Sequence, residues 1–282
     1  MALRQRTGHV ELLRCNSLDR EGVVHAITTR SGGVSPAPWD TLNLSWARPD
    51  TVENVLENRR RICTAIEVPL DRLVQAGQVH GIGVRVVGAA EAGRGAVTPA
   101  SLLPPSDALI TDASDVYLFA CFADCVPLLF YDSCRPAVGV AHAGWRGTVA
   151  GMAAATVRAF AEHFGTQPAD LRVVIGPSIG PCCYEVGPEV IGAVQERLPT
   201  APDLLSRCHG ATAYFDLWKA NHDQLIQAGV LDDHIEVSGL CTAHHTDTFF
   251  SHRATGGATG RFAVVIGLRP VGSSGGQAVD GQ

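Results

Sequence analysis

The stretch YLFACFADCVPLLFYDSCRPAVGVAHAGWRG, residues 117–147, decides how this chain folds. Two apolar runs within it, VPLLFYD and RPAVGVAH, are rich in residues that favour strands. The residues between them, Asp132 to Arg135, suit a tight turn. We therefore expect an antiparallel hairpin, closed by a loop of Ser133 and Cys134.

With that loop, Cys125 lies directly opposite His142. Opposed residues have Cβ atoms about 4.5–5.5 Å apart, close enough for a thiolate and an imidazole to share a Zn²⁺ ion. A loop of odd length would shift the register by one residue and weaken this inference. A buried cysteine also serves as a small hydrophobic residue, and a lone histidine as a hydrogen-bonded structural one, so both interpretations stay open.

The composition bounds the function. The chain has 282 residues, of which 46% are hydrophobic and 18% charged, enough for a large core. It begins without an apolar run of signal-peptide length, and its longest apolar stretch is broken by Asp124 and Pro127, so we expect a cytoplasmic protein without membrane insertion. Nine cysteines, an odd number, fit reduced thiols. A net charge of −6 without a basic run argues against nucleic acid and favours a small-molecule substrate. No obligate protein partner is inferred.

Hydrophobic periodicity predicts an α+β fold, because helices are separated by several strands rather than alternating regularly with them. No repeat or linker interrupts residues 1–268, which we expect to form a single domain, whereas residues 269–282 are expected to be a flexible tail. Outside the hairpin, helices are predicted at 51–68, 148–164, 187–198 and 216–228, and strands at 23–30, 72–79, 83–88, 107–111, 116–123, 171–176, 235–239 and 261–268.

Two glycine-rich turns are candidate walls of a site. After His142 the chain reads AGWRGTVAGM, and a helix N-terminus beside Arg146 would bind a phosphate or carboxylate. An ordinary strand-to-helix connection with a surface arginine explains the same residues. The second turn, IGPSIGPCCYEVG (175–187), contains adjacent cysteines that do not easily form a relaxed disulfide with each other, so simple packing is their plainest role.

Together the motifs resemble the laccase-domain family, whose bacterial members were once called polyphenol oxidases and are now regarded as purine nucleoside phosphorylases. The resemblance covers roughly residues 20–268. It implies a layered α/β/β/α sandwich with mixed, largely antiparallel sheets, similar to the catalytic domain of the cytotoxic necrotising factors. The motifs are TTRSGGVS (28–35), TLNL (41–44), QVHG (78–81), DALIT (107–111), ADCVPLLFYD (123–132), HAGWRG (142–147) and IGPSIGPCCYEVG (175–187).

The resemblance also implies a metal site and an activity. The ligands would be His80, Cys125 and His142, which leave one tetrahedral position of a zinc ion open, as in catalytic sites. Copper competes for such donors in vitro. The implied reaction cleaves adenosine, inosine and methylthioadenosine with phosphate to the free base and (methylthio)ribose 1-phosphate, accompanied by adenosine deamination.

Further residues are assigned roles at this site. Asp124, beside the thiolate, is either a general acid or base or a residue that orients a ligand, and both roles are kept. Arg30, Arg146 and Arg253 are the candidates for binding substrate and phosphate. Near Arg253 the chain departs from the family pattern, which commonly ends in F-x-S-x-R-R, because it reads CTAHHTDTFFSHRA (241–254).

The sequence is also compatible, to different degrees, with other functions. A multicopper laccase requires several H-x-H motifs, and the sequence contains none. The fragment His234-Ile235-Glu236 imitates the H-x-E of zinc deaminases but lacks their downstream P-C-x-x-C. A cysteine hydrolase that edits peptidoglycan precursors, with Cys125 as nucleophile and His142 as base, is the alternative enzyme. A metal-binding module without catalysis is the least favoured.

Overall fold

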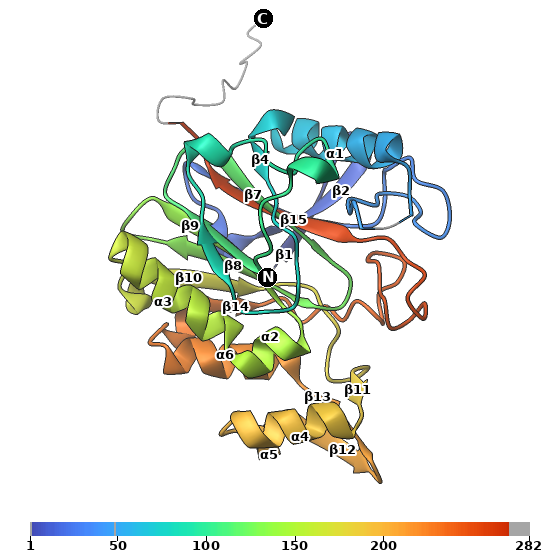
Figure 1. Cartoon of the computed structure of the whole chain (residues 1–282), viewed down its shortest axis with the longest axis vertical. Helices are drawn as coiled ribbons and strands as arrows, with labels where there is room; N and C mark the ends of the chain where they lie inside the picture. The colour runs from blue at the N-terminus through green and yellow to red at the C-terminus, as the bar shows by residue number, and fades with distance from the viewer. Residues whose placement is uncertain (1, 48, 271–282) are drawn as a thin grey trace, which may run out of the picture.

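The structure is a computed structural model that describes residues 2–47 and 49–270. Most of the predicted tail, residues 271–282, therefore lies outside the described residues. Two six-stranded sheets face each other, with helices on their outer faces (Figure 1). Within the described part of the chain, no helix has both the length and the apolar character that crossing a bilayer requires.

The first sheet is antiparallel except where its last two strands run parallel. Helix α1 (Val52–Ile66) covers its outer face, begins after Thr51, whose side chain accepts the Asn54 N–H, and buries Ile62 and Ile66 against the sheet. The sheet order is β1 (Ala2–Thr7), β2 (Val10–Cys15), β3 (Val23–Thr28), β15 (Phe262–Leu268), β7 (Val116–Phe122) and β4 (Leu73–Val74).

The second sheet contains the hairpin at its centre and is parallel only at its two edges. Its order is β14 (Ile235–Val237), β10 (Leu171–Ile175), β8 (Val126–Asp132), β9 (Ala137–Ala143), β6 (Ala108–Thr111) and β5 (Val84–Val86). The helices on its outer face are α2 (Trp145–Ala150), α3 (Met152–Phe164) and α6 (Leu217–Gln227).

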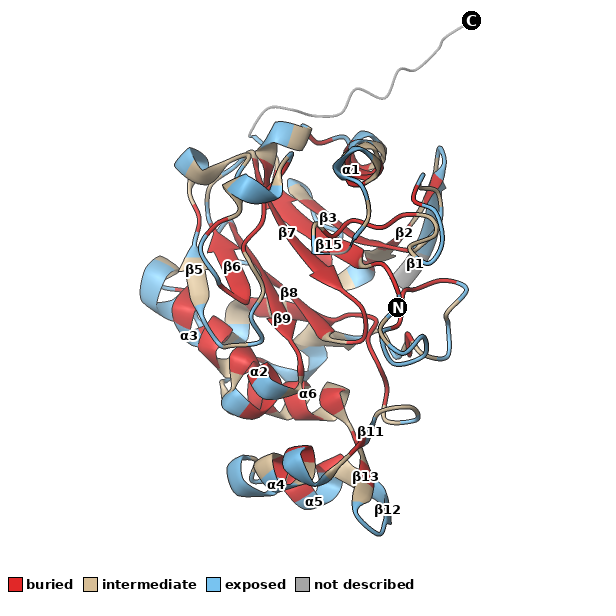
Figure 2. Cartoon of the chain, turned by 45° about the vertical axis from the view of Figure 1, so that its right-hand side comes forward, coloured by how far each residue is buried: buried red, intermediate tan, exposed pale blue. Residues whose placement is uncertain are grey.

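A continuous apolar core fills the space between the sheets. Leu118 and Val264 from the first sheet pack in one cluster with Leu129 and Val140 from the second. Figure 2 shows the strands β7, β8, β9 and β15 buried along their length. The layers are therefore helix, sheet, sheet and helix, and the expectation of an α/β/β/α sandwich with mixed, largely antiparallel sheets is confirmed. The extent of a single domain over residues 1–268 stays a prediction.

The hairpin forms as predicted, but its predicted register is wrong. Pro127, rather than Cys125, pairs with His142, and Asp132 pairs with Ala137. The turn contains four residues, 133–136, instead of two. Asp132 accepts the backbone N–H groups of residues 134 and 135 at 2.8 and 2.9 Å, which stabilises this wider turn. A shift by two residues preserves which side chains share a face, so the inference that brought Cys125 and His142 together survives the error.

Other features also depart from the expected elements. Strands β1 and β2 were not predicted, and the strand predicted at 72–79 covers only Leu73–Val74. The helix predicted at 148–164 begins at Trp145 and divides at Gly151, whose φ of +91° is favourable for glycine. A small third sheet, which was not predicted, projects with two helices from the main body in the lower part of Figure 1. It comprises β11 (Glu185–Val186), β13 (Thr212–Phe215) and β12 (Leu205–His209), with α4 (Pro188–Arg197) and α5 (Ala201–Leu204).

Candidate metal centre

Three side chains predicted as metal ligands meet at one end of the second sheet. His80 lies in the loop between β4 and β5, Cys125 directly precedes β8, and His142 lies in β9. Their ligand atoms are all within 4.8 Å of one another, and the two imidazole rings meet edge to face with centroids 4.8 Å apart. The structure thus brings together all three residues, although their role as ligands stays a prediction.

The loop that carries His80 is fixed by hydrogen bonds on both sides. The Gln78 amide donates to the backbone carbonyl of Cys121 at 2.9 Å and accepts the backbone N–H of the same residue at 3.0 Å. On the other side, the Asp107 carboxylate accepts the N–H groups of His80 and Gly81 at 2.9 and 2.7 Å. These contacts hold His80 in a left-handed conformation with φ of +62°.

Asp107 also fixes the orientation of His142. Its Oδ1 lies 2.9 Å from Nδ1 of His142, so Nε2 of that ring remains for a metal. Burial favours a raised pKa for Asp107, but the hydrogen bond from His142 and those from the His80 loop outweigh it and lower the pKa below its ordinary value. Asp107 was not singled out from the sequence. The signal was available in DALIT, where a charged residue directly precedes a buried strand.

The thiol and the imidazole change each other's ionisation. Burial by itself raises the pKa of Cys125, but the charge of His142 and hydrogen bonds from His142 and His80 outweigh it and lower the pKa to about 6. Burial lowers the pKa of His142, but the Cys125 thiolate and the Asp107 carboxylate outweigh it and raise the pKa to about 9. Both shifts favour a thiolate beside an imidazolium in the metal-free protein. The thiolate is the form that binds metals or attacks as a nucleophile.

The glycine of HAGWRG makes this approach possible. A Cβ atom on Gly144 would lie 2.9 Å from the His80 ring and 3.0 Å from the Cys125 sulfur. Any side chain at this position would therefore displace two of the three candidate ligands. Because Gly144 has no side chain, the tight connection from β9 to α2 leaves room for His80 and Cys125 to approach each other.

A pocket of about 540 Å³ opens onto the three residues. It combines an aromatic ring, two arginines and several polar groups, a mixture suited to a polar organic ligand. Its lining consists of Ser45, Ala47, Gln78, His80, Cys121, Ala123, Asp124, Cys125, His142, Ile179, Tyr184, His252, Arg253 and Arg261.

Asp124 connects two loops of this pocket. Its backbone has φ of +83°, and its carboxylate accepts the Thr242 hydroxyl and the backbone N–H of Arg253, each at 2.6 Å. Both oxygens are thus engaged by the loop that follows β14. Of the two roles kept for Asp124, these contacts favour positioning.

Of the three predicted arginines, only Arg253 lines the pocket. Its guanidinium lies 5.1 Å from the centre of the Tyr184 ring and donates to the carbonyl of Glu185 at 2.8 Å. Arg261, which the sequence did not single out, is the second arginine of the lining. Because it directly precedes β15, its position depends on the first sheet.

Arg30 and Arg146 are absent from the lining of this pocket. The Arg30 guanidinium pairs with Asp40 at 3.1 Å and donates to the carbonyl of Thr246 at 2.7 Å. Arg146 pairs with Glu189 at 3.2 Å, and its side chain is 59% exposed. Both arginines therefore have protein partners outside the pocket.

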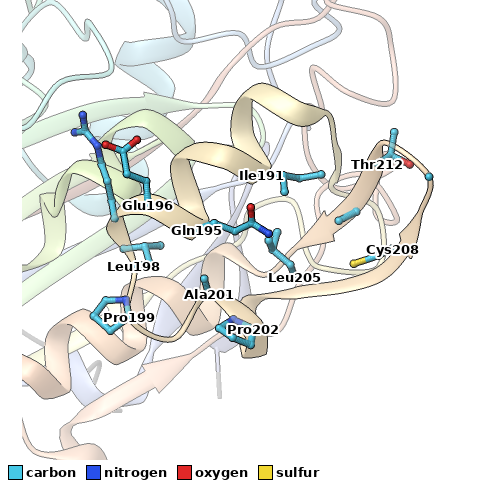
Figure 3. A pocket seen from close by; sticks show the side chains of 13 residues that line it. Ile191, Gln195, Glu196, Leu198, Pro199, Ala201, Pro202, Leu205, Cys208 and Thr212 are labelled. Carbon is cyan, nitrogen blue, oxygen red and sulfur yellow. The ribbon is translucent and has the colours of Figure 1, made fainter.

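A larger pocket of about 740 Å³ lies elsewhere, between the small third sheet and helices α4 and α5 (Figure 3). Its lining includes Gln195, Leu198, Leu205 and Thr212, but none of the three candidate ligands. The concentration of ionisable and metal-binding groups, rather than size, makes the smaller pocket the candidate site.

Comparison with known proteins agrees with the motifs. Residues 24–269 match a family described as Multi-copper polyphenol oxidoreductase laccase. The chain belongs to this family. Among the relatives, the purine nucleoside phosphorylase YlmD of Geobacillus stearothermophilus is 41% identical over 258 residues, which cover 91% of this chain and 94% of that protein.

Two solved structures similar to this chain have the same fold. The crystal structure of YlmD from Geobacillus stearothermophilus gives a TM-score of 0.90 at 38% identity, covering 96% of this chain and 100% of the other. The hypothetical protein YfiH of Bacillus licheniformis gives 0.88 at 36% identity, covering 93% and 97%. The resemblance inferred from the motifs is therefore confirmed.

Proposed function

We propose that this chain is a zinc-dependent purine nucleoside phosphorylase. The observation that carries the proposal is the set of His80, Cys125 and His142 at a pocket that also contains an aromatic ring and two arginines. The names of its relatives, purine nucleoside phosphorylases in several bacteria, support the same reaction class.

The donor set fits zinc. Two imidazoles and one thiolate are ligands that zinc prefers, and three protein ligands leave a position for substrate. The hydrogen bond between Asp107 and Nδ1 of His142 directs the opposite ring nitrogen toward the other two ligands, which is the usual support of a zinc-bound histidine. When bound, zinc supplies Lewis acidity that polarises an oxygen or carbonyl group of the substrate.

Phosphorolysis places clear demands on the other residues. A phosphate oxygen bonds to C1′ of the ribose while the C–N bond to the purine breaks, and the base leaves with the bonding electrons and takes up a proton. Tyr184 offers a ring for stacking a purine. Arg253 and Arg261 offer positive charge to phosphate from the same lining. Asp124 positions the first of these arginines through its backbone N–H.

The proposed substrates are adenosine, inosine and methylthioadenosine, and adenosine deamination is proposed as an accompanying activity. Because deamination uses water in place of phosphate, it requires no second anion site. Arg30 and Arg146 remain predicted substrate-binding residues, but they lie outside the pocket lining and pair with carboxylates, which makes them weaker candidates than Arg253.

The second candidate function is a cysteine hydrolase that edits peptidoglycan precursors. It is favoured by the lowered pKa of Cys125 and by the Asp107 carboxylate that orients His142, an arrangement that activates a cysteine nucleophile. A thiolate bound to zinc is a poor nucleophile, so the metal content of the active protein distinguishes the two functions.

A panel of nucleosides incubated with and without phosphate tests the proposal. Chromatography of free base, ribose 1-phosphate and deaminated nucleoside separates the reactions in one assay. We expect base and ribose 1-phosphate only when phosphate is present. Absence of ribose 1-phosphate, or of methylthioribose 1-phosphate from methylthioadenosine, at saturating phosphate for every nucleoside would reject the proposed function.

A further inference from the structure

A second group of metal-binding side chains lies outside the lining of the candidate metal centre. Cys182 and Cys183 come from the turn after β10, and Cys241 and His244 from the loop after β14. The four ligand atoms are all within 4.8 Å of one another. The four side chains therefore lie close together although they come from two separate segments of the chain.

We propose that these four side chains form a second, structural metal site that binds zinc. Three thiolates and one imidazole constitute a complete tetrahedral set for zinc, without a position left for substrate. The site thus differs from the first in both donor set and purpose. It goes beyond the proposed function and does not depend on it.

One distance within the cluster already matches a filled site, and the others need only small adjustments. Zinc bonds of about 2.3 Å to sulfur and 2.0–2.1 Å to nitrogen place tetrahedral ligands about 3.8 Å apart for two sulfurs and about 3.5 Å for sulfur and nitrogen. Sγ of Cys182 already lies 3.5 Å from Nδ1 of His244. Since no pair exceeds 4.8 Å, side-chain movements of about 1 Å complete the geometry.

Hydrogen bonds already fasten the two segments beneath the cluster. The N–H of Gly180 donates to the Cys241 sulfur at 3.3 Å, a contact that stabilises a metal-bound thiolate. Ser178 donates its N–H to the carbonyl of Leu240 and accepts the N–H of Thr242. The backbone is therefore preorganised on both sides of Cys241, and the three sulfurs are free thiols.

Zinc at this site would stabilise two segments that form the pocket of the candidate metal centre. The turn that contains Cys183 continues into Tyr184, and the loop that contains Cys241 continues into Thr242, which holds Asp124. The metal would link the segment that carries the aromatic ring to the loop that leads to Arg253. We therefore assign it a structural role.

Metal analysis of a protein whose first site is removed tests the proposal. His80→Asn with Cys125→Ser removes two of the first three ligands, and asparagine tolerates the left-handed backbone at position 80. This variant is expected to retain about one zinc per chain. Adding Cys182→Ser with His244→Ala, both exposed residues, should reduce the content to nearly none without disturbing the core.

The matched control adds Cys208→Ser with His245→Ala to the same background. These residues are also exposed, and they lie outside the cluster. The control should keep its zinc, and its X-ray absorption at the zinc edge should show three sulfur ligands and one nitrogen. Circular dichroism of each variant verifies folding.

The proposal is overturned if the first-site variant retains no zinc after growth and loading with zinc, or if Cys182→Ser with His244→Ala leaves its zinc unchanged. A disulfide among the three cysteines in protein purified under reducing conditions would also overturn it. None of these results depends on nucleoside cleavage, so failure of the proposed activity would be recognised separately.

Discussion

Asp107→Asn removes the charge that orients two of the candidate ligands while it preserves the size of the side chain. Oδ1 of Asp107 contacts Nδ1 of His142 and the N–H of His80, and Oδ2 accepts the N–H of Gly81. Asparagine has one acceptor oxygen, so its NH₂ group must face either His142 or the N–H groups of the His80 loop.

The expected loss of zinc affinity in Asp107→Asn follows from these contacts. A hydrogen bond to a charged group contributes about 1.5–3 kcal/mol, and at least one is lost in the variant. Loss of a carboxylate that supports a metal-bound histidine typically weakens metal binding 10- to 100-fold, which corresponds to about 1.4–2.7 kcal/mol. The two values agree, so we expect zinc affinity to fall by this factor and phosphorolysis at limiting zinc to fall with it.

Competition with a chromophoric chelator measures the affinity of the first site. Asp132→Asn is the matched control, because Asp132 is also buried and also accepts backbone N–H groups. Asp132 lies at the end of β8 that is away from Cys125. The control should lose thermal stability and keep its zinc affinity. Unchanged zinc affinity in Asp107→Asn would refute the assigned role of this carboxylate.

The other predictions concern the ligands and the arginines. Cys125→Ser should lose the zinc of the first site, measured by elemental analysis, because a hydroxyl is a far weaker ligand than a thiolate; full zinc content would exclude Cys125. Arg253→Ala should lower adenosine phosphorolysis about 10- to 150-fold and lower deamination less. Arg146→Ala should change both activities little, because Arg146 pairs with Glu189. A larger loss of phosphorolysis in Arg146→Ala than in Arg253→Ala would restore Arg146 as the phosphate ligand. In metal-free protein, the thiolate fraction of Cys125 rises as pH increases through its pKa of about 6, so alkylation followed by peptide mass spectrometry should show a midpoint there. A midpoint near 9 would contradict the influence of His142 on this thiol.

Sequence patterns predicted the central elements because burial imposes clear periodicity on them. Strands β7, β8 and β9 are apolar almost throughout, as expected for strands covered on both faces. Strand β12 was missed because four of its five residues are exposed, which leaves no apolar pattern to read. The register of the hairpin depended on the turn, where Asp132 selects a four-residue loop through its own hydrogen bonds.

The residues of the candidate site differ in how far the sequence predicted them. Cys125 and His142 followed from hairpin geometry, whereas His80 is one of eleven histidines and was identified only through the family motif. Asp107 carried a local signal, a charged residue directly before a buried strand, but its contact with His142 depends on how β6 and β9 pair. Arg261 carried no comparable signal, because its place in the pocket lining depends on the packing of the first sheet. The proximity of Cys182 to His244 likewise arises from the approach of two loops that are distant in the chain.

Ribose 1-phosphate formation from inosine and phosphate, measured on one preparation before zinc removal, after removal and after zinc is restored, tests the central claim most directly. The account predicts that activity disappears with the metal and returns when about one zinc per chain refills the first site. The Cys125→Ser variant should remain inactive after zinc is restored. Full activity in metal-free protein would contradict the account.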